Sequence, residues 1–192
     1  MARWDPGTAE RLTQAALELY TEHGYDNVTV TQIAERAGIT RRSYFRYFAD
    51  KREVLFAGSE RLPAALRAAV VDAHPAASPL YAALEALTQV GTALAEHIDR
   101  TAARRAVIAA SPELQERERT KLAMVTSAIE EALLQRGVDG EKAELAARLA
   151  TVASQSALDR WAAGRGENDF ETCLQAVVTS LRELLTDDVA PI

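Results

Sequence analysis

Arginine and hydroxyl side chains gather in one short stretch of this chain. Between residues 36 and 52, six basic residues face one acid, although the whole chain has a formal net charge of -6. The basic residues are Arg36, Arg41, Arg42, Arg46, Lys51 and Arg52. Guanidinium groups bind phosphate and guanine through paired hydrogen bonds, and hydroxyls such as those of Thr40 and Ser43 reach phosphates or base edges. The stretch therefore favours nucleic-acid binding; a patch that serves only solubility is the alternative.

Short helices are the elements that would position these groups. Apolar residues recur at three- and four-residue spacing between Thr8 and Glu22, which predicts an amphipathic helix that ends at Gly24. Thr29 with Gln32 three residues later predicts a capping box at the start of a second, short helix. That helix is expected to stop at residue 38, a glycine.

A third helix is expected to begin at Thr40 as its N-cap and to carry residues 41–48. Two short helices joined by about three residues around a glycine form a helix-turn-helix, whose second helix can lie in the DNA major groove. The helical period places Tyr44 and Phe48 on an inward side, with Ile33 and Ile39. It leaves on another side Arg41, Arg42 and Phe45, and the two arginines are candidates for contacts with guanine.

A fourth helix is expected near Lys51, because Asp50 and Glu53 have the spacing of another capping box. Lys51 would then lie beside free amides at a helix start, which suits a phosphate. Pro63 would remove a hydrogen bond about three turns into this helix, so a kink or a restart is predicted there. Such a bend could help to transmit a ligand-induced movement, and a helix end of no regulatory meaning is the alternative.

The N-terminal residues closely resemble the DNA-binding domain of TetR-family transcriptional regulators. The resemblance covers roughly residues 8 to 56 and rests on the following segments: residues 15–20 (AALELY), 24–25 (GY), 28–34 (VTVTQIA), 37–39 (AGI) and 45–48 (FRYF), followed by Lys51. It implies an all-helical homodimer, usually a repressor that a small molecule releases from a palindromic operator. It also implies that DNA is contacted by Thr29, by Thr40, Arg41, Arg42 and Ser43, and by Lys51.

One departure from the family pattern bears on the contacts. Many members have two tyrosines and a histidine where this chain has Phe45, Arg46 and Tyr47. Phe45 has no hydroxyl for a phosphate, and Arg46 could supply a charge-assisted hydrogen bond in its place. The Tyr47 phenol could reach a phosphate or could simply face water.

The rest of the chain predicts long helices and no strand. Turn signals divide it into a fifth helix from Leu80 to Ile98, a sixth from about Asp99 to Ala110, and three more, at residues 112–137, 139–163 and 170–185. We therefore expect an all-α chain of about nine helices: a helix-turn-helix domain at residues 1–52 and a ligand-binding and dimerisation domain at 53–192. The alanine-rich eighth helix and the last helix would form the dimer interface, or would pack only within the monomer.

The effector of such a regulator is a small molecule that the sequence does not identify. The candidate ligand-binding residues are His97, Arg104, Gln155 and Trp161, each of which is at least as well explained as a structural residue.

Other classes of protein are disfavoured. The chain has three scattered histidines and one cysteine, and it lacks a nucleophile elbow and a phosphate-binding glycine loop, so no enzyme, metal site or cofactor is expected. No stretch reaches the roughly 18 apolar residues of a membrane span, and no secretory signal is expected, which favours the cytoplasm. The rival functions are a helical interaction module that has lost DNA binding and a small all-helical enzyme.

Overall fold

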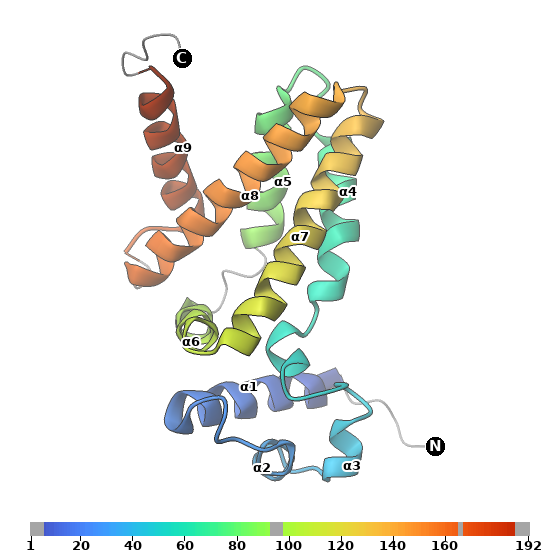
Figure 1. Ribbon diagram of the computed structural model, residues 1–192, viewed down its shortest axis with the longest axis vertical. Coiled ribbons are helices and arrows are strands. Elements are labelled where there is room, and N and C mark those ends of the chain that lie inside the picture. Colours follow the sequence, from blue (N-terminus) through green and yellow to red (C-terminus); the bar gives the residue numbers. More distant parts are fainter. Residues whose placement is uncertain (1–5, 93–97, 165–166, 187–192) are drawn as a thin grey trace. The chain divides into compact units, whose positions relative to one another are not determined.

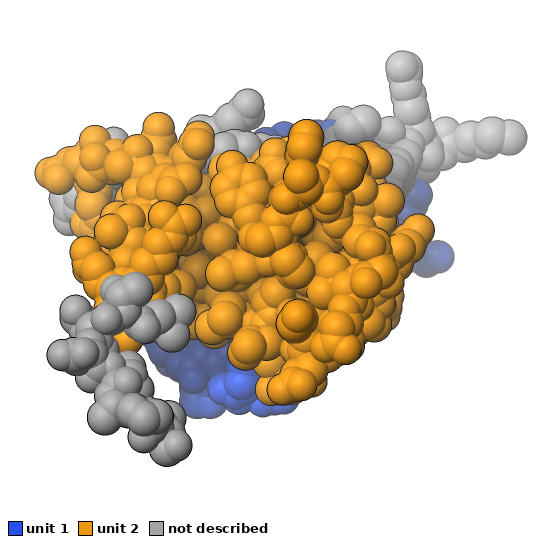
Figure 2. All heavy atoms as spheres, turned by 90° about the horizontal axis from the view of Figure 1, so that it is seen from above, with its two compact units in different colours: residues 1–60, 100–121 blue, residues 61–99, 122–192 orange. Residues whose placement is uncertain are grey.

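The computed structural model describes residues 6–92, 98–164 and 167–186 (Figure 1). Within these ranges the chain forms nine α-helices and two short 3-10 helices, and none of the described residues lies in a strand. The prediction of an all-α chain is confirmed. The helices belong to two compact units, which Figure 2 draws in different colours. Among the described residues, no helix combines the length and the apolar character needed to cross a membrane.

Unit 1 combines two separate parts of the sequence, residues 1–60 and 100–121. Its elements are α1 (Pro6–His23), α2 (Val30–Arg36), α3 (Arg41–Tyr44), the 3-10 helix η1 (Glu53–Phe56), most of α6 (Ile98–Ala109) and the start of α7 (Pro112–Gln135). Its buried core includes Leu12, Tyr20, Ile33, Tyr44, Val54 and Leu114, each at most 2% exposed. The core thus draws on both parts of the sequence.

Glycines shape the helix ends that frame α2. Gly24 follows α1 with φ +79°, and its amide donates to the Tyr20 carbonyl at 2.9 Å. Gly38 follows α2 with φ +74°, while the next amide, that of Ile39, donates to the Ala34 carbonyl at 2.9 Å. Residues that carry a Cβ atom rarely adopt this left-handed backbone conformation, which explains why a glycine follows both helices.

The third helix is shorter than the sequence predicts. α3 ends at Tyr44, and residues 45–47 continue as tight turns, with the Arg46 amide bonded to the Ser43 carbonyl and the Tyr47 amide to the Tyr44 carbonyl. These bonds join residues three apart, which is the tighter 3-10 pattern. The expected inward side is nevertheless correct, because Tyr44 and Phe48 are both buried.

The predicted fourth helix near Lys51 is wrong. The segment forms η1, then a second 3-10 helix, η2 (Ser59–Arg61), and only then α4 (Leu62–Asp72). The Asp50 carboxylate does accept from the amides of Arg52 and Glu53, at 2.8 and 3.1 Å, but the Glu53 carboxylate binds another residue, so no capping box closes. Pro63 lies in the first turn of α4, where its missing N–H costs nothing, so it marks a restart and not a kink.

Unit 2 comprises residues 61–99 and 122–192, as far as they are described. It contains α4, α5 (Pro79–Thr92), the remainder of α7, α8 (Gly140–Ala163) and α9 (Phe170–Thr186). The last helices of the chain match the predicted ranges closely. The α8 alanines that we expected to bring helix axes together do so inside the chain, because Ala146, Ala147, Ala150, Ala153 and Ala157 are all buried in the core of unit 2.

Candidate nucleic-acid interface

The N-terminus of α2 is held by a complete capping box. The Thr29 hydroxyl accepts from the Gln32 amide at 3.3 Å, and the Thr29 amide donates to Gln32 Oε1 at 2.8 Å. Thr29 is exposed, and the free amides at a helix start favour an anion. The position predicted for Thr29 is therefore open to a phosphate.

The start of α3 is capped in the same manner. The Thr40 hydroxyl accepts from the Ser43 amide at 3.1 Å, and the two hydroxyls lie 3.0 Å apart in a mutual hydrogen bond. Only one of them can donate in that bond, so the pair keeps a donor and free lone pairs for another partner. Thr40 is exposed and Ser43 is partly exposed.

Three exposed arginines surround this capped start: Arg41, Arg42 and Arg46. Among the residues that the structure describes, no carboxylate forms an ion pair with any of them. Other arginines of the chain do have carboxylate partners: Arg36, Arg52, Arg67, Arg100, Arg104, Arg117, Arg119 and Arg148. The positive charge near α3 is therefore not neutralised within the described part of the chain.

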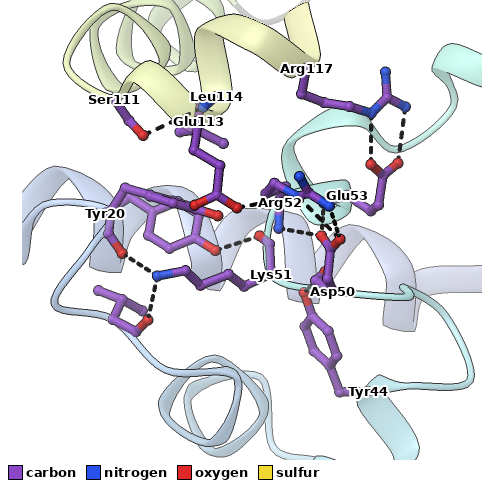
Figure 3. Close-up of polar contacts among 12 residues, drawn as sticks. Tyr20, Tyr44, Asp50, Lys51, Arg52, Glu53, Ser111, Glu113, Leu114 and Arg117 are labelled. Carbon is purple, nitrogen blue, oxygen red and sulfur yellow. Dashed lines mark hydrogen bonds and ion pairs between the residues drawn. The ribbon is translucent and has the colours of Figure 1, made fainter.

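Two buried tyrosines fix the segment that follows α3. The Tyr44 hydroxyl donates to the Asp50 carbonyl at 3.0 Å, and the Tyr20 hydroxyl donates to the Lys51 carbonyl at 2.6 Å. Burial raises the pKa of both phenols, so both stay protonated and keep donating. Figure 3 shows these contacts around Asp50 and Lys51.

Lys51 makes contacts within the chain that the sequence does not predict. Its ammonium donates to the carbonyls of Tyr25 at 2.9 Å and Val28 at 3.3 Å, and it lies 4.0 Å from the centre of the Tyr25 ring. Two of its three N–H donors are used in this way. The contacts tie Lys51 to the loop that leads into α2, and the expected phosphate contact stays a prediction.

Arg36 and Arg52, the other two arginines of the basic stretch, have carboxylate partners. Arg36 pairs with Glu22 at 3.1 Å. Arg52 pairs with Asp50 at 2.7 Å and with Glu113 at 3.3 Å, as Figure 3 shows. The hydrogen bond from Arg52 lowers the pKa of the Asp50 carboxyl, and the amides of Glu53 and Arg52 add to this effect, so the carboxylate stays charged. Tyr47 is partly buried against the core of unit 1.

Comparison with known proteins identifies this N-terminal region. Residues 12–57 match the family described as bacterial regulatory proteins, tetR family. The chain is 37% identical over 75 residues to the HTH-type transcriptional regulator TcmR of Streptomyces glaucescens, which covers 39% of this chain and 33% of that protein. Residues 12–57 therefore form a TetR-family N-terminal domain.

A second relative matches the same region. The putative mycofactocin biosynthesis transcriptional regulator MftR of Mycobacterium tuberculosis is 43% identical over 47 residues, which are 24% of each chain. This chain thus covers 33% of the length of TcmR and 24% of the length of MftR. What the rest of each relative does is not carried over by these matches.

Solved structures extend the likeness in fold to most of the chain. A SmeT–triclosan complex covers 91% of both chains with a TM-score of 0.64 and 20% identity. Thermus thermophilus FadR, a TetR-family repressor in complex with lauroyl-CoA, covers 96% of this chain and 98% of its own, with a TM-score of 0.56 and 22% identity. The whole described chain therefore has the TetR-family fold, with its N-terminal helix-turn-helix and C-terminal helical domain.

Three of the four predicted ligand-binding residues lie in the described part of the chain, and ligand binding by any of the four stays a prediction. Arg104 lies in unit 1, where it donates to the Leu55 carbonyl at 2.7 Å and pairs with Glu118 at 3.2 Å. Gln155 and Trp161 lie on α8 in unit 2, and Trp161 is buried. His97 lies outside the described residues. Arg104 thus has a structural role that the sequence did not reveal.

A cluster of charges around Phe56 was missed in the sequence. The buried Phe56 ring lies 4.9 Å from the Arg104 guanidinium carbon and 4.8 Å from that of Arg117. Arg117 also pairs with Glu53 at 2.6 Å (Figure 3). The mixed charges around Arg117 look like an ordinary solvated helix face, and nothing local indicates a partner 64 residues away.

Proposed function

We propose that this TetR-family member is a sequence-specific DNA-binding transcriptional regulator, and that it acts as a ligand-released repressor on a palindromic operator. The observation that carries the proposal is the set of three exposed arginines, Arg41, Arg42 and Arg46, without a carboxylate partner among the described residues. Guanidinium groups without carboxylate partners, on α3 and on the turn that follows it, suit an anionic, base-bearing ligand. The names of the relatives, which describe regulators, favour binding over catalysis.

The proposed contacts divide into two kinds. Arg41 and Arg42 lie at the start of α3, where a guanidinium can take both acceptors of a guanine edge. Hydroxyl and cationic groups bind phosphates or position the protein at most protein–DNA interfaces. We propose this role for six residues: Thr29, Thr40, Ser43, Arg46, Tyr47 and Lys51. The first kind would give sequence preference and the second kind affinity.

The exposed face of α8 supports a homodimer. Leu145 and Val152 are 58% and 60% exposed, and they lie two helical turns apart on one face. On α9, Leu184 is 70% exposed. A second copy of this chain would bury apolar side chains that are exposed to solvent in the monomer. We propose this interface through the last two helices, on faces opposite to the alanines that fill the core.

The effector is proposed to be a small molecule, with candidate contacts at His97, Arg104, Gln155 and Trp161. The names of two structures with the same fold state that SmeT binds triclosan and that FadR binds lauroyl-CoA. For this chain they support only the class, a small organic ligand. The cytoplasm, which holds both the DNA and reducing conditions for the single free Cys173, is the proposed compartment.

The experiment that tests the function is selection of bound fragments from random DNA at two salt concentrations. We expect enrichment of a palindrome, and a loss of affinity by orders of magnitude between roughly 50 and 200 mM salt, because several phosphates release their counterions. The Arg41→Ala variant should lose enrichment. Arg119→Ala is the matched control, because it removes one exposed positive charge from α7.

The rival function is a helical interaction module without DNA binding. It predicts no enriched sequence and little dependence of DNA binding on salt. That result with the purified protein would overturn the proposed function. If Arg41→Ala and Arg119→Ala reduced enrichment equally, the DNA would be bound through exposed positive charges in general and not through α3.

A further inference from the structure

Phe45 is an apolar ring in the midst of the exposed arginines. It is 46% exposed, and it is the only exposed large apolar side chain among the described residues of unit 1. Every other phenylalanine or tyrosine of the helix-turn-helix segment is at least partly buried in the core. Water therefore meets a hydrophobic surface at the place where the DNA is proposed to lie.

Two neighbouring side chains contact the Phe45 ring. The Phe45 ring stands edge-on to the buried Tyr44 ring, with centres 5.6 Å apart and planes at 81°. The Arg41 guanidinium carbon lies 5.4 Å from the centre of the same ring. The Tyr44 hydroxyl donates to the Asp50 carbonyl, so the Phe45 ring packs on a side chain that is itself held in the core.

A phenyl ring can read only one feature of the major groove. It neither donates nor accepts a hydrogen bond, so it cannot distinguish the polar edges of guanine, adenine or cytosine. The 5-methyl group of thymine is the apolar feature that the major groove offers. Phe45 is the C-cap of α3 and its ring lies beside the Arg41 guanidinium, so the two side chains can address neighbouring base pairs.

We propose that Phe45 is a specificity-determining residue, whose ring contacts the methyl group of a thymine beside the base that Arg41 reads. The inference rests on the proposed function, and it adds a preference that none of the polar candidates can supply. Removing the methyl group from that thymine should weaken binding by about fourfold per contact, which is the effect of exposing one methyl-sized apolar group.

The test uses the 192-residue chain and the operator obtained by selection. Each thymine of one half-site is replaced in turn by deoxyuridine, which lacks only the methyl group, and Kd is measured for wild type, Phe45→Ala and Phe45→Leu. We expect one position where uracil weakens wild-type binding about fourfold and leaves Phe45→Ala unaffected. Phe45→Leu should keep part of the effect. Tyr81→Ala, which removes an exposed ring from α5, should behave as wild type.

Three results would overturn the inference, and each can be told from the others. If the operator binds but every uracil substitution affects wild type and Phe45→Ala alike, Phe45 reads no thymine. If Phe45→Ala lost selectivity at a guanine but kept the wild-type response to uracil, Phe45 would only position Arg41. If no operator is obtained at all, the proposed function itself fails and the inference falls with it.

Discussion

Arg42 is the side chain that points most directly away from the anchored face of α3. It lies about 160° around the helix from the buried Tyr44, and no described carboxylate pairs with it. We expect Arg42→Ala to relax base preference at one operator position by about 1 to 3 kcal/mol and to leave other positions unchanged. Selection followed by sequencing measures this directly. An unchanged preference at every position would mean that Arg42 contacts only the backbone.

Lys51 should behave differently, because its ammonium has structural partners. Removing it leaves the carbonyls of Tyr25 and Val28 without their donor, so we expect Lys51→Ala to lower the free energy of unfolding by about 1 to 2 kcal/mol. Binding should weaken alike for all DNA sequences, because a phosphate contact carries no base information. Urea unfolding and titration with two unrelated operators measure the two effects.

A variant that keeps the aliphatic part of the Lys51 side chain separates the effect of its packing from the effect of its ammonium group. Lys51→Met retains most of the packing on the Tyr25 ring and removes the charge and the donors. If it matched wild type in both stability and affinity, the ammonium would have no role in either.

At the scale of elements, α8 presents two different faces. Its alanines are buried inside the chain, whereas Leu145 and Val152 are exposed on the other side. We expect Val152→Glu to weaken dimerisation at least tenfold, which is about 1.4 kcal/mol, without unfolding the chain. Sedimentation at a series of protein concentrations measures it. The matched control is Met124→Glu, at a half-exposed apolar position of α7; equal weakening by both variants would argue against an interface on α8.

The elements that could be predicted from the sequence are those determined by neighbours in the sequence. The capping box of α2 joins Thr29 to a residue only three positions away, and the burial of Tyr44 and Phe48 follows from the helical period. Pro63 is ambiguous in sequence, because proline either interrupts a helix or opens one. The 3-10 helix η1 was missed because its surroundings come from residues about 50 to 64 positions later, such as Arg104 and Arg117.

The candidate DNA contacts divide in the same way. Exposure of Arg41 and Arg42 follows from local periodicity, and the structure agrees with it. Other contacts depend on how segments far apart in the sequence pack together. Examples are the hydrogen bonds from Lys51 to two loop carbonyls and the ion pair of Arg104 with Glu118. No sequence pattern carries that information.

At the scale of the whole molecule, stability should depend on pH through Glu118. Burial raises the pKa of this carboxyl, but Arg104 and Lys121, at 3.2 and 2.6 Å, more than offset burial, so the pKa is lowered. Its contribution is therefore present above the ordinary pKa of about 4.3 and is lost as the pH falls through the lowered value. Glu118→Gln should cost about 3 kcal/mol near neutral pH, because it leaves two cations without a counter-charge.

Urea unfolding of wild type and Glu118→Gln from about pH 7 to about pH 3 measures this dependence. The difference between the two should shrink towards acid, where the wild-type carboxyl also becomes neutral. A difference that stays constant over this range would show that the charge of Glu118 contributes nothing. Glu116→Gln, at an exposed position of the same helix, is the control.

The two-part composition of unit 1 has a consequence for exchanging modules between relatives. A chimaera that transplants only residues 1–60 onto another protein leaves behind residues 100–121, which supply the Leu114 side chain to the core and Arg117 to Glu53. Because α7 begins in unit 1 and continues in unit 2, no single crossover point separates them. A working graft would have to replace two segments together, or to rebuild the Phe56 cluster in its new host.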